Sequence, residues 1–263
     1  MVGLVLYGVR GQPADAPAPP VWMGLEALLG SLIWVPVALL AARHRGLSVS
    51  QATAWRLPSN SLWKLLPLAS AAGLFMLTPA VWLQQLSTHF MPKLGTNLIQ
   101  QLEEQDPSST ALGLIALSVV VVAPVAEEIF FRGFAFRGIS QRRGFWPAAI
   151  IVSAVFAVIH IEPTNMAPIF TLSILLCWLQ WKTSSVIPPI LCHMVYNGVQ
   201  IAGWLTARDN PDFNLSSSAE KETIPFAAVA VSVVLLMAVI YGVREITGTK
   251  DRSKPPSLLK PDL

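Results

Sequence analysis

The sequence is poor in charged residues. Aspartate, glutamate, lysine and arginine make up 13% of its 263 residues, whereas soluble domains usually carry about a quarter. Hydrophobic residues make up 53%, and the mean hydropathy is +0.56. The formal net charge of +3 comes from basic residues in short loops between apolar runs, which is typical of membrane orientation and not of nucleic-acid binding. The composition therefore predicts an integral membrane protein, with the lipid bilayer as a partner and no nucleic acid.

Cysteine is also scarce. The two cysteines, Cys177 and Cys192, both lie within apolar runs, which excludes a disulfide scaffold and a thiolate zinc site. The first nine residues are apolar but short, with no basic residue ahead of them, so we expect no signal peptide. We expect this segment to lie at the interface or to belong to a further helix.

The chain is rich in long apolar runs. A helix needs about 20 predominantly apolar residues to cross a bilayer. The expected spans cover residues 21–42, 65–86, 111 to the Glu127–Glu128 pair, 145–161, 166–181, 186–205 and 224–243. The pattern predicts an all-α, polytopic transmembrane helix bundle of about seven spans, or eight if residues 1–9 belong to a helix. A turn at Glu162–Pro163 is expected to separate the fourth and fifth spans.

The loops predict the orientation and the division of the chain. Basic connections follow the odd-numbered spans and acidic ones the even-numbered spans, so the positive-inside rule places the C-terminus in the cytoplasm. The long polar stretch 87–110 is expected to hold a short amphipathic helix at the membrane surface. We divide the chain into an N-terminal transmembrane region (1–110), a catalytic core (111–205), and the last span with a basic, disordered tail (206–263).

The charges inside the third span indicate a function. Glu127, Glu128 and Arg132 directly follow the apolar run 114–122, and ionisable side chains at membrane depth are costly and usually functional. On a helix, Glu128 and Arg132 lie one turn apart on one face and can pair. Glu127 points about 100° around the axis. We expect this free carboxylate to take part in the chemistry.

Two later spans carry polar residues at helical spacing. His193 and Asn197 share one face of the sixth helix, and His160 follows Phe156 at the same spacing on the fourth. Polar groups in hydrocarbon need partners, so we predict one polar cavity between the third, fourth and sixth helices. There, Glu127 with His160 would activate water, and His193 with Asn197 would stabilise an oxyanion.

Other functions remain open at this point. Glu127, Glu128, His160 and His193 include enough nitrogen and oxygen ligands for zinc, although the His-Glu-x-x-His helix of common zinc peptidases is absent. We expect no metal and no cofactor. A non-catalytic membrane partner protein is a second alternative. An ion or proton transporter is a third, although the chain has no internal repeat to support it.

The three motifs together resemble a known family. Glu127-Glu128-x-x-x-Arg132, Phe156-x-x-x-His160 and His193-x-x-x-Asn197 are similar to the pattern of the CAAX prenyl protease and bacteriocin-processing (CPBP, or Abi) family of glutamic intramembrane endopeptidases. The resemblance covers about residues 111–205.

This resemblance implies a metal-independent protease that hydrolyses a peptide bond in a membrane-associated peptide or protein, either prenylated or carrying a leader. It gives Glu127 and His160 the activation of water and His193 and Asn197 the oxyanion site, while Glu128 and Arg132 orient the site. Because the family includes members named for immunity or scaffold roles, a non-catalytic member is also compatible with the motifs.

The expected depth of His160 conflicts with this site. At about 1.5 Å per residue, Glu127 and His193 lie near the cytoplasmic half, whereas His160 falls toward the outer end of a straight fourth helix. Two explanations are open. Either the fourth helix starts deeper than Arg143 suggests, or Gly133 and Gly138 let the third helix bend back. In both cases we expect the cavity to open mainly to the cytoplasm.

Overall fold

The described part of the protein is all α-helical. The computed structural model describes residues 20–55, 62–91, 107–209 and 223–248, and none of these residues forms a strand. The predicted all-α fold is therefore confirmed. The expectations for residues 1–9, for most of the stretch 87–110 and for the basic tail fall outside the described residues.

The described residues form thirteen helical elements. In chain order they are α2 (Pro20–Leu32), α3 (Trp34–His44), α4 (Val49–Thr53), α5 (Leu62–Ser87), α7 (Ser109–Leu117), η1 (Ser118–Val122), α8 (Ala123–Glu128), η2 (Ile129–Phe136), α9 (Arg137–Arg143), α10 (Phe145–Val158), α11 (Pro163–Thr183), α12 (Ile187–Asp209) and α14 (Phe226–Thr247). The elements η1 and η2 are π-helical.

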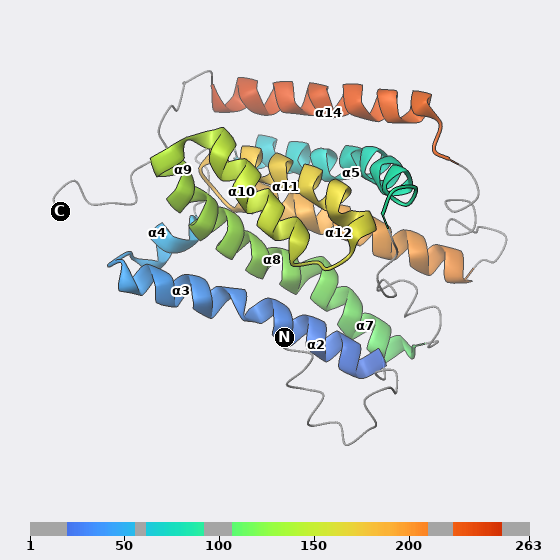
Figure 1. The fold of residues 1–263 in the computed structure, drawn as a ribbon, viewed down its shortest axis with the longest axis horizontal. Coiled ribbons are helices and arrows are strands. Elements are labelled where there is room, and N and C mark those ends of the chain that lie inside the picture. Colours follow the sequence, from blue (N-terminus) through green and yellow to red (C-terminus); the bar gives the residue numbers. More distant parts are fainter. Residues whose placement is uncertain (1–19, 56–61, 92–106, 210–222, 249–263) are drawn as a thin grey trace.

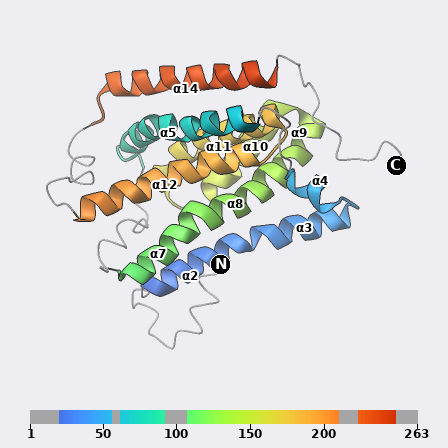
Figure 2. The ribbon, with the colours of Figure 1, turned by 180° about the vertical axis from the view of Figure 1, so that it is seen from behind.

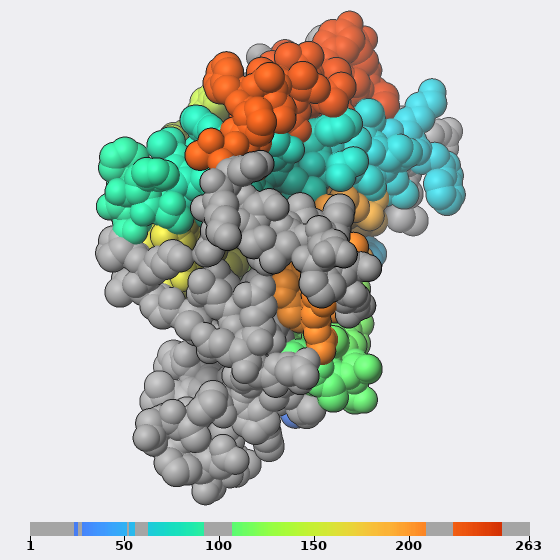
Figure 3. All heavy atoms as spheres, turned by 90° about the vertical axis from the view of Figure 1, so that its right-hand side faces the viewer, coloured from blue at the N-terminus to red at the C-terminus, as the bar shows by residue number. Residues whose placement is uncertain are grey.

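The helices pack side by side in layers (Figures 1 and 2). Helix α14 lies on one edge against α5, and α5 packs on α11 and α12. Figure 3 shows α14 lying across α5 on the outside of the bundle. At the opposite edge, α2 and α3 run along the helix that begins with α7. The inner helices α10, α11 and α12 lie between these edges.

Three described helical stretches are long and apolar enough to cross a membrane. They are Trp63–Ser87, Ser109–Arg143 and Phe226–Thr247, and the shorter stretches Leu28–His44 and Phe145–Val158 are also apolar. In hydrocarbon a helix satisfies its backbone hydrogen bonds internally, which is why these apolar runs fold as helices. The structure thus agrees with an α-helical membrane protein, while the number of about seven spans stays a prediction.

The third predicted span is much longer than expected. Elements α7 to α9 form one continuous helix of 35 residues, from Ser109 to Arg143. It continues through Gly133 and Gly138, so of the two explanations left open for the depth of His160, the structure does not show a bend at these glycines. At about 1.5 Å per residue it spans roughly 50 Å. The polar motif therefore lies near the middle of this helix and not at its end.

Proline sets two helix boundaries differently from the prediction. Pro163 was expected in a turn, but it is the first residue of α11, where its missing N–H breaks no hydrogen bond. Glu162 caps this helix by accepting hydrogen bonds from the backbone N–H and hydroxyl of Thr164. In the first predicted span, Pro36 cannot donate to the carbonyl of Leu32, and the helix is interrupted between α2 and α3.

Two glycines allow close contacts between elements. A Cβ on Gly133 would lie 2.5 Å from the backbone oxygen of Thr53, and a Cβ on Gly73 would collide with the backbone oxygen of Cys192. Gly133 therefore lets α4 pack on η2, and Gly73 lets α5 approach α12. These contacts explain why glycine occurs inside apolar helices, where it is otherwise unfavourable.

Replacing Gly73 by alanine tests the packing of α5 on α12. Gly73→Ala should lower the free energy of unfolding by about 1–3 kcal/mol, because the added methyl group forces the two backbones apart. Gly113→Ala is the matched control, since nothing lies within 4 Å of its Cβ position. A fluorogenic maleimide that reacts with the buried Cys177 and Cys192 would report thermal unfolding in detergent. Equal melting temperatures for the two variants would contradict the close approach.

Candidate active site

The long third helix brings His160 to the level of the glutamates. Glu128 precedes Gly144 by sixteen residues, and His160 follows it by sixteen. Gly144 has a φ of +78° and turns the chain between α9 and α10. Because the two helices run in opposite directions from this turn, equal residue counts return His160 to the depth of Glu128. Helix α10 therefore starts well past the glutamates, and His160 near its end does not lie at a different depth from Glu128, contrary to what the sequence suggested.

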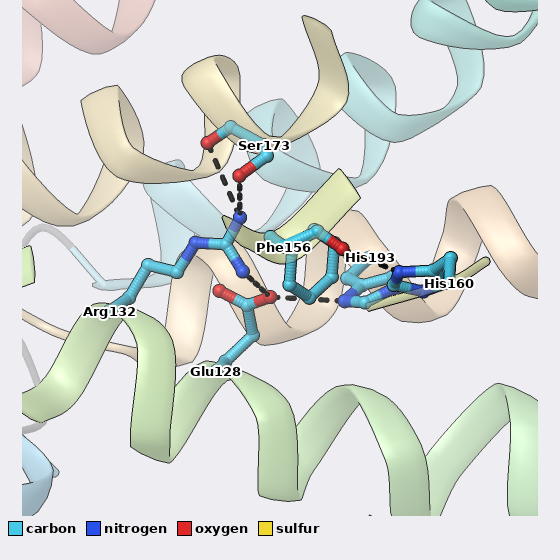
Figure 4. A network of polar contacts seen from close by, with 6 residues as sticks. All are labelled: Glu128, Arg132, Phe156, His160, Ser173 and His193. Carbon is cyan, nitrogen blue, oxygen red and sulfur yellow. Dashed lines mark hydrogen bonds and ion pairs between the residues drawn. The ribbon is translucent and has the colours of Figure 1, made fainter. Parts of the chain in front are cut away.

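A buried ion pair forms the centre of the site (Figure 4). Arg132 Nη1 donates to Glu128 Oε1 at 2.7 Å, and both side chains are 0% exposed. Their spacing of four residues predicts this pair. Arg132 Nη2 donates to the hydroxyl oxygen of Ser173 on α11 at 2.6 Å and lies 3.3 Å from the Ser173 backbone oxygen. The guanidinium carbon lies 4.5 Å from the centre of the Phe156 ring.

Glu128 also contacts the histidine of the sixth predicted span. His193 on α12 is 4% exposed, and its Nδ1 lies 3.0 Å from Glu128 Oε1. A carboxylate paired with arginine can only accept hydrogen bonds, so Nδ1 carries the proton. The Nε2 atom of a neutral His193 is then an acceptor. It can donate a hydrogen bond to an oxyanion only when the imidazole is doubly protonated.

His160 also uses Nδ1 for a structural hydrogen bond. It lies in the turn that ends α10 and donates from Nδ1 to the backbone oxygen of Phe156 at 2.6 Å. Its ring packs edge-on against Phe156 with 4.8 Å between ring centres, and the Phe156 ring is 6.0 Å from that of His193. The Nε2 of His160 has no hydrogen-bond partner in the described chain. This atom is therefore available as a base or acceptor.

Asn197 makes a contact that its sequence position does not reveal. Its Nδ2 donates to the backbone oxygen of Val119 at 2.9 Å. The π-helical turn η1 directs the N–H of Ala123 to Ser118, and the next residue, Pro124, has no N–H to offer. The Val119 oxygen is thus left without a donor within its own helix, and Asn197 supplies one. One N–H of the Asn197 amide remains for another acceptor.

Glu127 stays apart from these hydrogen bonds. It is half-buried, and its carboxylate makes no hydrogen bond within the described residues. It lies within electrostatic range of His193, Glu128 and Arg132. The structure therefore joins Glu128 to His193 and leaves Glu127 as the carboxylate without a hydrogen-bond donor. The proposed roles of Glu127 and Asn197 in catalysis stay predictions.

The sequence did not reveal two of the contacts that hold Arg132. Ser173 was not singled out, and Phe156 was treated only as part of a motif, yet both hold Arg132. The signal for Ser173 in the sequence is a hydroxyl in an apolar run that also contains Thr171, and it does not say what Ser173 binds. No group of three or more His, Cys, Asp or Glu side chains in the described chain is placed to hold a metal ion.

Comparison with known proteins supports the family resemblance. Residues 109–199 match the family model described as type II CAAX prenyl endopeptidase Rce1-like. This match covers all three motifs. The predicted resemblance is confirmed over this segment. The Rce1-like segment nearly coincides with the predicted core 111–205.

A curated relative agrees with this assignment. The chain is 25% identical over 87 residues to a protein of Bacillus subtilis (strain 168) named "Putative membrane peptidase YdiL". The alignment covers 33% of this chain and 36% of that protein. No solved structure matches the chain significantly. The Rce1-like segment is thus similar to a family of membrane CAAX-type proteases.

Removing one partner of the buried ion pair tests how much this pair contributes to the stability of the protein. Arg132→Met should lower the free energy of unfolding by about 3–5 kcal/mol, since it leaves the Glu128 carboxylate buried without a counter-ion. The double variant Glu128→Gln/Arg132→Met should lose less than the sum of the two single variants. Thermal unfolding of the four proteins measures this coupling. Additive losses would show that the two charges are independent.

The hydrogen bond of Asn197 gives a second test. Asn197→Ala should lower the free energy of unfolding by about 1–3 kcal/mol, because the Val119 oxygen loses its donor. Gln200→Ala is the control, since within the described chain the exposed Gln200 donates a hydrogen bond only to the backbone oxygen of Tyr196 on its own helix. The same maleimide assay compares both variants with the parent protein. A larger loss in the Gln200 variant would contradict the proposed link between α12 and η1.

Proposed function

We propose that the protein is an intramembrane endopeptidase that hydrolyses a peptide bond in a membrane-associated substrate. One observation carries the proposal. Helices distant in sequence place Glu128 against His193, and both His193 and His160 lie beside the Phe156 ring, with the Nδ1 atom of each histidine already engaged. Glu127 lies within electrostatic range of His193. Both Nε2 atoms are then the reactive positions of the imidazoles. A carboxylate beside such histidines can activate water.

In the proposed reaction, water is the nucleophile. Glu127, assisted by Nε2 of His160, removes a proton from water as the oxygen bonds to the carbonyl carbon of the peptide. The negative charge that develops on the carbonyl oxygen is stabilised by the remaining N–H of Asn197 and by doubly protonated His193. The C–N bond then breaks, and the proton is passed to the leaving amine. Glu128 and Arg132 keep His193 in place and do not contact the substrate.

We further propose a lipid-modified peptide as the substrate. The support is the description of the matched family as CAAX prenyl endopeptidases and the apolar helices around the site, which suit a substrate held in the bilayer. The protein would be a multi-pass membrane protein with its C-terminus in the cytoplasm, as the loop charges predict.

A Glu127→Gln variant tests this function. Purified protein in liposomes would be given a fluorogenic farnesylated peptide with a C-terminal CAAX sequence and the same peptide without the lipid. Glu127→Gln should lower kcat by about 100-fold or more, the typical contribution of a general base. Glu245→Gln, an exposed carboxylate on α14, is the matched control and should keep full activity.

The other outcomes distinguish the alternatives. Unchanged turnover in Glu127→Gln would exclude Glu127 as the base. Activity that is abolished by a strong chelator and restored by zinc would instead support a metalloprotease. If the folded parent protein cleaves neither peptide, and cells keep their phenotype with Glu127→Gln, the non-catalytic membrane partner is the better explanation.

A further inference from the structure

We propose that Ser173 is a positioning residue of the site, acting on His193 through Arg132 and Glu128. Its catalytic consequence rests on the proposed function, but the contact itself can be tested without any substrate. Ser173 is 0% exposed and lies on α11, a helix that carries none of the three motifs. The proposal adds a fourth helix to the site.

The first step is the orientation of the guanidinium. Arg132 contacts Glu128 on its own helix, the Phe156 ring on α10, and both Ser173 and Cys177 on α11. The ring contact limits tilting of the guanidinium plane but leaves rotation within that plane free. The hydrogen bonds to Glu128 and Ser173 together fix this rotation, and the Ser173 hydroxyl oxygen accepts from Nη2 at 2.6 Å. Without the hydroxyl, the nearest oxygen acceptor left on Ser173 is its more distant backbone oxygen, at 3.3 Å, and Cys177 offers only a weak sulfur acceptor.

The second step is the carboxylate of Glu128. Its Oε1 accepts from both Arg132 and His193, whereas its buried Oε2 has no partner in the described chain. Arginine readily binds both oxygens of a carboxylate at once. A guanidinium released from Ser173 can rotate toward Oε2 and form such a pair. This would turn Oε1 away from the imidazole.

The third step is the proton on His193. The hydrogen bond to Glu128 holds the proton on Nδ1 and orients the ring about its Cβ–Cγ bond. When this bond weakens, the proton can move to Nε2, and the ring can rotate. Ser173 therefore determines which nitrogen of His193 faces the reacting groups, although it touches neither His193 nor the substrate.

The tautomer of His193 tests the geometry directly. Protein labelled with 15N-histidine would be studied in liposomes by solid-state NMR, and the His193 signals assigned by their loss in His193→Gln. At a pH where His193 is neutral, the parent protein should carry the His193 proton on Nδ1. Ser173→Ala and Ser173→Gly, two ways to remove the hydroxyl, should both shift the proton toward Nε2, and Ser173→Thr should restore the parent spectrum. Thr171→Ala, which removes an exposed hydroxyl from the same helix, should change nothing.

Kinetics with the farnesylated peptide test the catalytic consequence. Ser173→Ala should lower kcat by about tenfold with little change in KM, since small misplacements of catalytic groups reduce rate more than binding. A parent-like His193 spectrum in both hydroxyl-free variants would overturn the proposal, as would a tautomer shift that leaves kcat unchanged. If the parent protein cleaves no peptide, the proposed function fails, and the spectra still decide whether Ser173 positions His193.

Discussion

The burial of Arg132 with Glu128 is the constraint on which the rest of the site depends. Two fully desolvated charges cost several kcal/mol each, and their attraction offsets this only when further hydrogen bonds satisfy them. Ser173 and His193 provide such hydrogen bonds, and the ring of Phe156 adds a cation–π contact, all from three other helices. Glu128 Oε2 and Arg132 Nε have no hydrogen-bond partner within the described residues. The ion pair therefore specifies the arrangement of α10, α11 and α12 around η2 more than it stabilises the fold.

The shape of the third helix is a second condition for the site. Its extension to Arg143 gives α10 the length it needs to return His160 to the level of Glu128. π-helical turns lie on both sides of the glutamates, and such turns are frequent at functional sites. The first of them, followed by a proline, frees the backbone oxygen that Asn197 binds. The long helix thus sets both the depth of the site and the position of α12.

Local spacing predicted part of this arrangement. The all-α fold, the pairing of Glu128 with Arg132 and the shared face of His193 and Asn197 follow from apolar runs and helical periodicity. The role of Gly133 does not, because this glycine makes room for the backbone of Thr53, which lies 80 residues earlier in the chain. Nor could Ser173 be found, since a serine in an apolar helix carries no local sign of its partner. What sequence spacing misses here are contacts between residues far apart in the chain.

The two adjacent glutamates have different hydrogen-bond partners for a geometric reason. Neighbouring residues on a helix point about 100° apart, so they cannot both face Arg132 and His193. Glu128 receives both donors on one oxygen and is fixed in place, whereas Glu127 remains half-buried and without a hydrogen-bond donor in the described chain. A carboxylate committed to two donors is a weaker base than one that is free. For this reason the proposed reaction assigns the proton from water to Glu127 and not to Glu128.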